Sequence, residues 1–188
     1  MEPQERIHLL ARVARSPGIA KGTTSSTSIL TLAAASYGAK FNDDATVPTG
    51  FDPNAAKLFE AIVEGAYLVA SADGVIDASE RETFEKVVAA ACGSVVAESQ
   101  VTALVADLAD QLSEDGLDQR LKAIGERVSK REHGEEVLRI AALLAQVSES
   151  VSDVERDVLA KLAAACNLTP TDVDLAMSDV KQALSTPS

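Results

Sequence analysis

The chain contains an internal repeat, and this repeat constrains its fold more than any other feature of the sequence. Residues 60–92 align without a gap with residues 135–167, and the apolar positions of the two copies match. A third segment follows each copy, because residues 101–112 match residues 173–184. Apolar residues recur every three or four positions in these segments, which is the period of an amphipathic helix. Each half is therefore predicted as helix, loop, helix, turn, helix, and the two halves predict a pseudo-twofold domain.

The composition favours the same all-α fold class. Apolar residues form 46% of the chain but aromatic residues only 3%, so the core must be aliphatic. Alternating apolar and polar runs, which are typical of strands, are few. We predict a compact helical domain of two three-helix repeats at residues 53–188, preceded by an N-terminal extension at residues 1–52.

Capping residues predict where several helices begin. Asp52-Pro53 opens the first helix of the domain, because Asp is a good N-cap and Pro suits the first helical position. This helix carries apolar residues on two sides, which predicts a central position. Asp77 with Glu80, and Ser152 with Glu155, form capping-box pairs that open the second helix of each repeat.

Other signals predict the remaining boundaries. Gly93 ends a helix, and a helix over Leu117–Val128 connects the two halves and ends near residues 130–134. The second repeat is predicted to begin at Glu135. Thr169-Pro170 opens the last helix.

The N-terminal extension is predicted to contain two short helices. Gln4–Arg15 is amphipathic, and Ser28–Ala39 is apolar but too short to span a bilayer. We expect Ser28–Ala39 to form a helix docked on the domain rather than a cleaved signal peptide. The sequences between and after them are rich in turn-forming residues and are predicted as a linker and a loop.

The charge of the chain limits its partners. The formal net charge is −12, which repels phosphate backbones and argues against nucleic-acid binding. An acidic surface suits solubility, a cation or a basic partner. The two cysteines, Cys92 and Cys166, lie at apolar helix ends without metal-ligand spacing, so we expect buried thiols in a reducing compartment.

The most informative stretch for function is "LVASADGVIDASERETF", residues 68–84. Asp73, Asp77 and Glu80 lie on either side of Gly74, and carboxylate oxygens are the ligands that hard cations such as Ca²⁺ and Mg²⁺ prefer. The stretch matches the second half of an EF-hand loop but not the first, because Val69 offers no side-chain ligand. An ordinary EF-hand is therefore not expected.

The second copy of this loop indicates that these residues could have a structural role as an alternative to metal binding. Ser148, Glu149 and Ser152 occupy the positions of Asp73, Gly74 and Asp77, and only Glu80 has an identical counterpart, Glu155. A shared glutamate at the third helical position is what a capping role alone predicts.

Nothing in the sequence indicates catalysis. G-x-S-x-G, P-loop and H-E-x-x-H motifs are absent, and neither His8 nor His133 is placed as a general base. We therefore do not expect an enzyme, and a metal-dependent hydrolase is kept only as a third hypothesis.

The two loops carry a family resemblance. "ASADGVIDASE", residues 70–80, matches the pattern A-x-A-D-G-x-I-x-x-x-E, and "AQVSESVSDVE", residues 145–155, is a weaker copy. Together with the flanking helices, at about residues 53–185, they resemble the TerB family of tellurite-resistance proteins and relatives that include a domain of some DnaJ-type co-chaperones. The resemblance implies a compact all-helical fold with pseudo-twofold symmetry, and no enzymatic activity follows from it.

The resemblance also implies a divalent metal site in an acidic patch near the two loops. Asp73 and Glu80 would carry it by match, with Glu155 from the second copy and with Asp77 and Glu149 nearby. The ion would be Ca, Mg, Mn or Zn. The second copy departs from the family pattern, because it has Ser-Glu where a full copy would have Asp-Gly.

These observations predict a cytoplasmic, non-enzymatic adaptor or sensor in a stress response of the tellurite-resistance type. Its partners would be proteins, including a membrane-associated stress complex at the inner face of the membrane; a homodimer is left open. The alternative is a metal-independent protein-interaction module that uses an apolar groove.

Overall fold

The described part of the chain is helical and contains no strand, which confirms the predicted all-α fold class. The computed structural model describes residues 2–18, 27–39, 52–74, 76–93, 95–148 and 151–186. The α-helices are α1 (Pro3–Arg15), α2 (Ile29–Ala39), α3 (Pro53–Ala70), α4 (Ala78–Cys92), α5 (Glu98–Asp115), α6 (Leu117–Arg127), α7 (Arg131–Leu144), α8 (Asp153–Ala165) and α9 (Pro170–Ser185), with a 3₁₀ turn, η1 (Ala145–Ser148), after α7. The pseudo-twofold relation between the halves stays a prediction.

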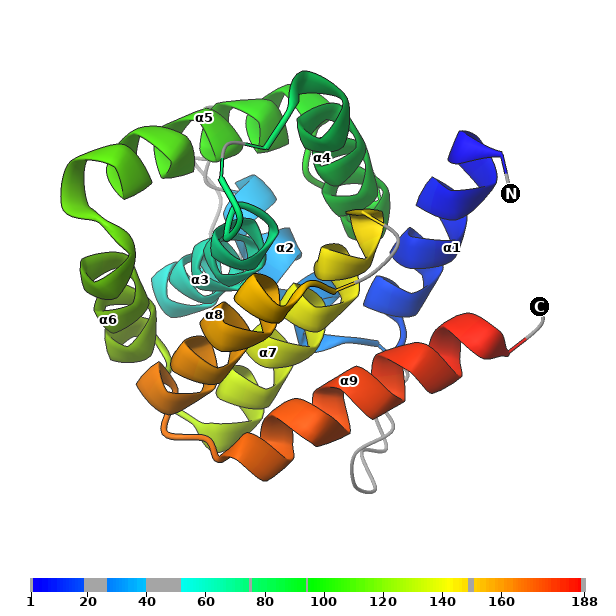
Figure 1. Ribbon diagram of the computed structural model, residues 1–188. Coiled ribbons are helices and arrows are strands. Elements are labelled where there is room, and N and C mark those ends of the chain that lie inside the picture. The colour runs from blue at the N-terminus through cyan, green and yellow to red at the C-terminus, as the bar shows by residue number, and fades with distance from the viewer. Residues whose placement is uncertain are drawn as a thin grey trace.

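Helices α3 and α7 lie side by side at the centre, and the other helices surround them (Figure 1). Residues 61–69 of α3 and 136–144 of α7 are all buried, so each central helix is covered on every side along this length. The central position predicted for α3 is confirmed. Gly65 permits the close packing, because a β-carbon there would lie 2.9 Å from Cγ1 of Val137.

The predicted capping residues open the helices as expected. The side chain of Asp52 accepts a hydrogen bond of 2.9 Å from the backbone N–H of Asn54, and Pro53 is the first residue of α3. Capping boxes open α4 and α8, as predicted. Gly93 ends α4 with a φ of +66°, a conformation that glycine adopts without strain.

The start of α7 differs from the prediction. The helix begins at Arg131, so the charged segment that was predicted to end the preceding helix forms its first turn. Arg131 forms an ion pair of 2.8 Å with Glu135 one turn later. Gly134 is a packing residue rather than a stop, because a β-carbon there would lie 3.1 Å from the β-carbon of Cys166.

The two N-terminal helices pack into the same core as the rest of the chain. Helix α1 contacts α4, α7 and α9, and α2 contacts α3 along much of its length. The rings of Tyr37 in α2 and Phe59 in α3 lie 4.7 Å apart. The helix predicted over Ser28–Ala39 is confirmed as a docked helix. The boundary predicted between residues 52 and 53 coincides with the start of α3 and stays a prediction about domain organisation.

Arginines hold α1 against the body. Arg15 donates a hydrogen bond of 3.0 Å to the carbonyl of Ala90, near the end of α4. Arg12 donates to the carbonyl of Thr186, just after α9, and Arg6 donates to the carbonyl of Gln146 in η1. Carbonyls at helix ends lack intrahelical partners and carry partial negative charge, so they are good acceptors for arginine.

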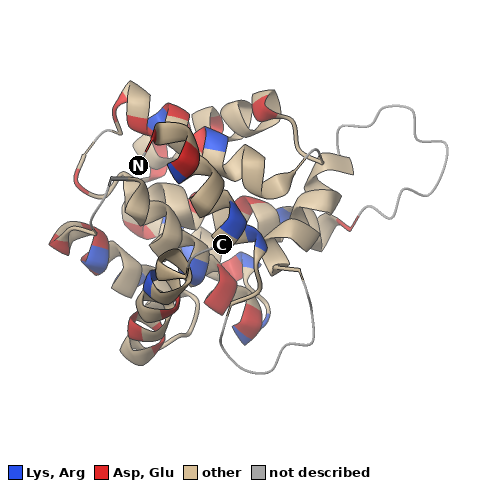
Figure 2. Cartoon of the chain, turned by 90° about the vertical axis from the view of Figure 1, so that its right-hand side faces the viewer, with Lys and Arg blue, Asp and Glu red and all other residues tan. Residues whose placement is uncertain are grey.

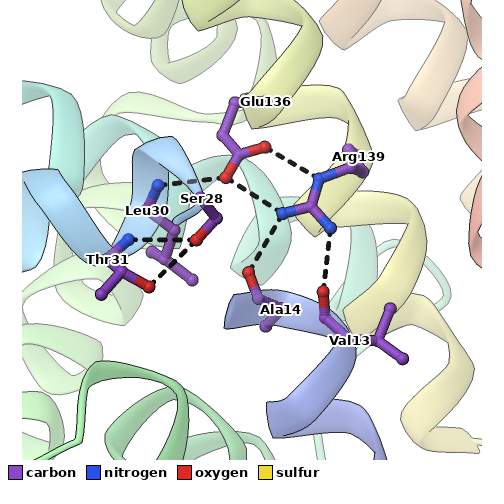
Figure 3. Close-up of polar contacts among 7 residues, drawn as sticks. All are labelled: Val13, Ala14, Ser28, Leu30, Thr31, Glu136 and Arg139. Carbon is purple, nitrogen blue, oxygen red and sulfur yellow. Dashed lines mark hydrogen bonds and ion pairs between the residues drawn. The ribbon is translucent and has the colours of Figure 1, made fainter. Parts of the chain in front are cut away.

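A buried ion pair in α7 connects α1 to α2 (Figure 3). Glu136 and Arg139 pair at 2.8 Å, and their side chains are 6% and 9% exposed. The guanidinium donates hydrogen bonds of 3.1 and 3.0 Å to the carbonyls of Val13 and Ala14 at the end of α1. The carboxylate accepts a hydrogen bond of 3.0 Å from the backbone N–H of Leu30 at the start of α2. Each charge therefore faces the helix end of opposite polarity.

Charged residues are interspersed over the helices on the side that carries the chain ends (Figure 2). The acidic and basic positions are mixed there, although the chain has a net charge of −12. Among the described residues, no helix combines the length and the apolar character that crossing a bilayer requires.

Both cysteines are buried free thiols, as predicted. Burial raises the pKa of Cys92 to about 12, although Arg15 opposes the shift, and burial raises the pKa of Cys166 to about 11. Both thiols are therefore protonated in the folded chain at neutral pH, and they serve as small apolar side chains of the core.

Removing one partner of the buried ion pair should destabilise the folded chain. Arg139→Met leaves the carboxylate of Glu136 buried without a cation, which should lower the free energy of unfolding by about 3–5 kcal/mol. The double variant Glu136→Met, Arg139→Met should be more stable than Arg139→Met, because no buried charge remains. Urea denaturation measures both values. A loss below about 1 kcal/mol in Arg139→Met would mean that the pair does not anchor the two N-terminal helices.

The buried thiols should make the free energy of unfolding depend on pH in the alkaline range. The unfolded chain ionises its cysteines near pH 9, whereas the folded chain holds their protons to higher pH. The thiols thus contribute stability that is present below pH 9 and is lost as the pH rises toward 11–12. The free energy of unfolding should therefore fall more steeply between pH 8 and pH 10 in the wild type than in the Cys92→Ala, Cys166→Ala variant. Equal slopes in urea denaturation would contradict this expectation.

Candidate functional site

The first acidic loop follows the end of α3. Ser71 ends the helix and its hydroxyl donates a hydrogen bond of 2.8 Å to the carbonyl of Tyr67. The chain then turns through Ala72 and Asp73 to Gly74, which has a φ of +144°. Such a conformation is open to glycine at little cost. The turn leaves Asp73 exposed in the loop between α3 and α4.

Glu80 and Glu155 occupy equivalent places in two capping boxes. Oε2 of Glu80 accepts a hydrogen bond of 3.2 Å from the backbone N–H of Asp77, and Oε2 of Glu155 accepts one of 2.6 Å from that of Ser152. Oδ1 of Asp77 in turn accepts hydrogen bonds of 2.8 and 2.9 Å from the backbone N–H groups of Ser79 and Glu80 in the first turn of α4. The predicted capping role of both glutamates is therefore confirmed, and it occupies one oxygen of each carboxylate.

Three of the predicted metal ligands line one small cavity, which we call the inter-loop cavity. It has a volume of about 30 Å³, enough for one ion or water molecule. Its lining residues are Ala70, Asp73, Ile76, Glu80, Phe84, Leu144, Val147 and Glu155. The structure thus brings Asp73 and Glu80 from the first motif together with Glu155 from the second.

The other two predicted ligands are not part of this group. The carboxylate of Asp77 caps α4 and does not line the inter-loop cavity. Glu149 lies outside the residues that the structure describes. Within those residues, no three His, Cys, Asp or Glu side chains are arranged so that they could hold a metal ion. Carboxylate oxygens suit a hard cation in their chemistry, but Asp73, Glu80 and Glu155 would have to move closer together to bind one.

Glu155 differs from the other buried carboxylates in its partners. The buried glutamates of the described residues are Glu64, Glu85, Glu136 and Glu155. Three of them pair with arginine: Glu64 with Arg120 and Arg127, Glu85 with Arg81, and Glu136 with Arg139. Glu155 is 4% exposed and has no cationic partner among the described residues. Burying a carboxylate without a counter-charge is unfavourable, and an added cation would reduce this cost.

A larger cavity of about 340 Å³ lies beside α2, α3 and α5. Tyr37, Glu60, Asp107 and Arg127 are among its lining residues. Burial, followed by the charges of Glu60 and Asp107, raises the pKa of Tyr37 to about 12. The phenol is therefore protonated at neutral pH.

The two histidines lie apart from both cavities. His8 is exposed on α1, and His133 lies in the first turn of α7. Burial and, secondarily, the charge of Lys130 lower the pKa of His133, so its imidazole is neutral at pH 7.

The apolar wall of the inter-loop cavity was not predicted from the sequence. Phe84, Leu144 and Val147 cover the side away from solvent. One signal was available, because Phe84 follows Glu80 by four residues and therefore shares its helix face. The burial of Glu155 without a counter-charge depends on tertiary packing and has no signal in the sequence.

Comparison with models of known protein families gives a match. Residues 60–178, more than half of the chain, match the family model described as tellurite resistance protein TerB. Neither the curated proteins nor the solved structures gave a match. The matched stretch runs from within α3 into α9 and contains both acidic loops. On this match, and with an all-helical fold that carries both motif loops at one cavity, the chain belongs to the TerB family.

Proposed function

We propose that this chain is a non-enzymatic adaptor or sensor in a chemical-stress response of the tellurite-resistance type. The proposed signal is a divalent cation in the inter-loop cavity, and the proposed output is the shape of the surface around the two loops. The observation that carries the proposal is the buried carboxylate of Glu155, which has no cationic partner among the described residues. Membership of the TerB family supports the stress response.

The cation would use oxygens that the capping boxes leave available. Oε2 of Glu80 and of Glu155 accept the capping hydrogen bonds, so Oε1 of each remains for a ligand role. A hard cation can be bound without loss of either cap, because a carboxylate can bridge a donor and an ion.

Asp73 would couple the cation to the surface. Its side chain is exposed and lines the cavity from the solvent side, next to Gly74. Turning this carboxylate toward the ion would draw the loop after α3 toward α8. A partner that contacts this loop would then distinguish the loaded from the empty chain, which is how a cation changes a binding surface.

The proposed location is the cytoplasm, with a membrane-associated stress complex at the inner face of the membrane as partner. Two observations are compatible with it. Cys92 and Cys166 are free thiols, as is usual in a reducing compartment. The net charge of −12 favours basic protein partners over nucleic acid.

A metal-independent interaction module is the second candidate function. A groove between α2, α7 and α9 favours it, because part of its apolar lining is exposed. In that case a water molecule rather than a cation would solvate Glu155 in the inter-loop cavity.

Thermal unfolding separates the two candidates. A cation present at 100 times its Kd adds about 2.7 kcal/mol to the free energy of unfolding. For a chain of this length the melting temperature should rise by roughly 5–10 °C. We expect the rise with at least one of Ca²⁺, Mg²⁺, Mn²⁺ and Zn²⁺, measured after treatment with EDTA.

Asp73→Asn should remove most of this rise without disturbing either capping box, because Asp73 caps no helix. The matched control is Glu114→Gln, which removes one exposed charge from the end of α5. The cation proposal fails if no ion raises the melting temperature, or if both variants respond like the wild type.

A further inference from the structure

A groove of about 300 Å³ lies between the start of α2, the first half of α7 and the first half of α9. Its apolar lining includes Ile29, Leu32, Leu138, Leu175 and Ala176. Leu32 is 58% exposed and Leu175 is 51% exposed, so these two leucines present apolar surface to solvent from α2 and α9. Large apolar side chains that are exposed around one cavity mark a surface that can bind another molecule.

The charged residues of the groove are mainly acidic. Its lining carboxylates are Glu132, Glu135, Glu136, Asp172 and Asp179. Among the described residues, these carboxylates form ion pairs with Lys130, Arg131 and Arg139. Asp179 forms no hydrogen bond or ion pair with the described residues. In the described part of the groove, the carboxylate of Asp179 therefore lies without a cationic partner on the same wall as the exposed Leu175.

The base of the groove is fixed by the contacts in Figure 3. Glu136 and Arg139 form the buried ion pair that holds the start of α2 and the end of α1. Ser28 lines the groove and shares a hydrogen bond of 3.0 Å with Thr31. Because these groups already have partners, an incoming molecule would meet a preformed surface and lose little free energy to ordering it.

We propose that this groove binds an amphipathic helix of a partner protein that carries leucine-like side chains flanked by lysine or arginine. The apolar side chains would lie between Leu32 and Leu175, and the basic ones beside Asp179 and Glu132. Along α9 the groove extends from Asp172 to Asp179, about 10 Å or two helical turns. Two apolar residues four positions apart would span this length.

Charge complementarity favours this occupant over the alternatives. An anionic lipid surface or a nucleic acid would be repelled by the acidic lining. A second copy of the chain carries the same net charge of −12. Its basic amphipathic helix, α1, has its apolar face buried against its own core. The helix must therefore come from a different protein. The inference deepens the proposed adaptor role and rests on it, but it does not depend on the cation.

The probe is a synthetic 14-residue amphipathic helix of leucine and lysine, titrated into the full chain in EDTA and followed by isothermal titration calorimetry. We expect saturable binding of one peptide per chain. The double variant Leu32→Ser, Leu175→Ser should weaken binding roughly tenfold or more. Both side chains are more than half exposed, so the variant should fold, which circular dichroism checks.

Two matched controls isolate the groove. Val95→Ser, Val154→Ser removes two other exposed apolar side chains, which are 47% and 49% exposed, and should leave the affinity unchanged. Asp179→Asn should weaken binding several-fold, whereas Glu114→Gln, with the same change in charge, should not.

The proposal would be overturned if the groove variants and the control variants weakened peptide binding equally, or if binding did not saturate. It would also be overturned if a peptide with serine in place of leucine bound equally well, or if the wild type formed a dimer that Leu175→Ser dissociates. The last result would assign the groove to a second copy. Failure here with a normal cation response would leave the cation proposal intact, and a normal peptide response without a cation effect would support the metal-independent module.

Discussion

The architecture depends on the close approach of α3 and α7 at Gly65. Any larger residue there would have to displace Val137, so glycine sets the distance between the two central helices. Because they lie side by side, the loops after them are also neighbours, and Asp73 meets Glu155 at one cavity although 82 residues separate them. The candidate site is thus a consequence of core packing. Neither loop forms it alone.

Helix α7 also holds the two N-terminal helices, α1 and α2, in place. Arg139 and Glu136 lie one turn apart on α7, and each offers its charge to the end of a different helix. Neither α1 nor α2 is part of the stretch that matches the family, yet both contribute buried residues to the common core. The pair helps to position the start of α2 beside the groove, which links the proposed docking surface to the N-terminal part of the chain.

Local signals in the sequence predict much of the fold, whereas tertiary contacts decide the rest. Asp52, Asp77 and Ser152 mark helix starts correctly, because an N-cap acts on its own first turn. The start of α7 was predicted at Glu135 rather than at Arg131, and Gly134 in its first turn packs against Cys166. Both capping glutamates are also predictable. The burial of Glu155 without a counter-charge is not predictable, since it depends on side chains from α3, α4 and η1 that line the same cavity.

We propose above that the buried carboxylate of Glu155 makes the inter-loop cavity a cation site. Equilibrium dialysis against Ca²⁺, Mg²⁺, Mn²⁺ or Zn²⁺, followed by elemental analysis, tests it most directly when the wild type is compared with Glu155→Gln. Glutamine can still accept the capping hydrogen bond of Ser152 but has no charge. We predict one ion per wild-type chain and none in the variant. Equal metal content in the two chains, or none in either, would contradict the claim.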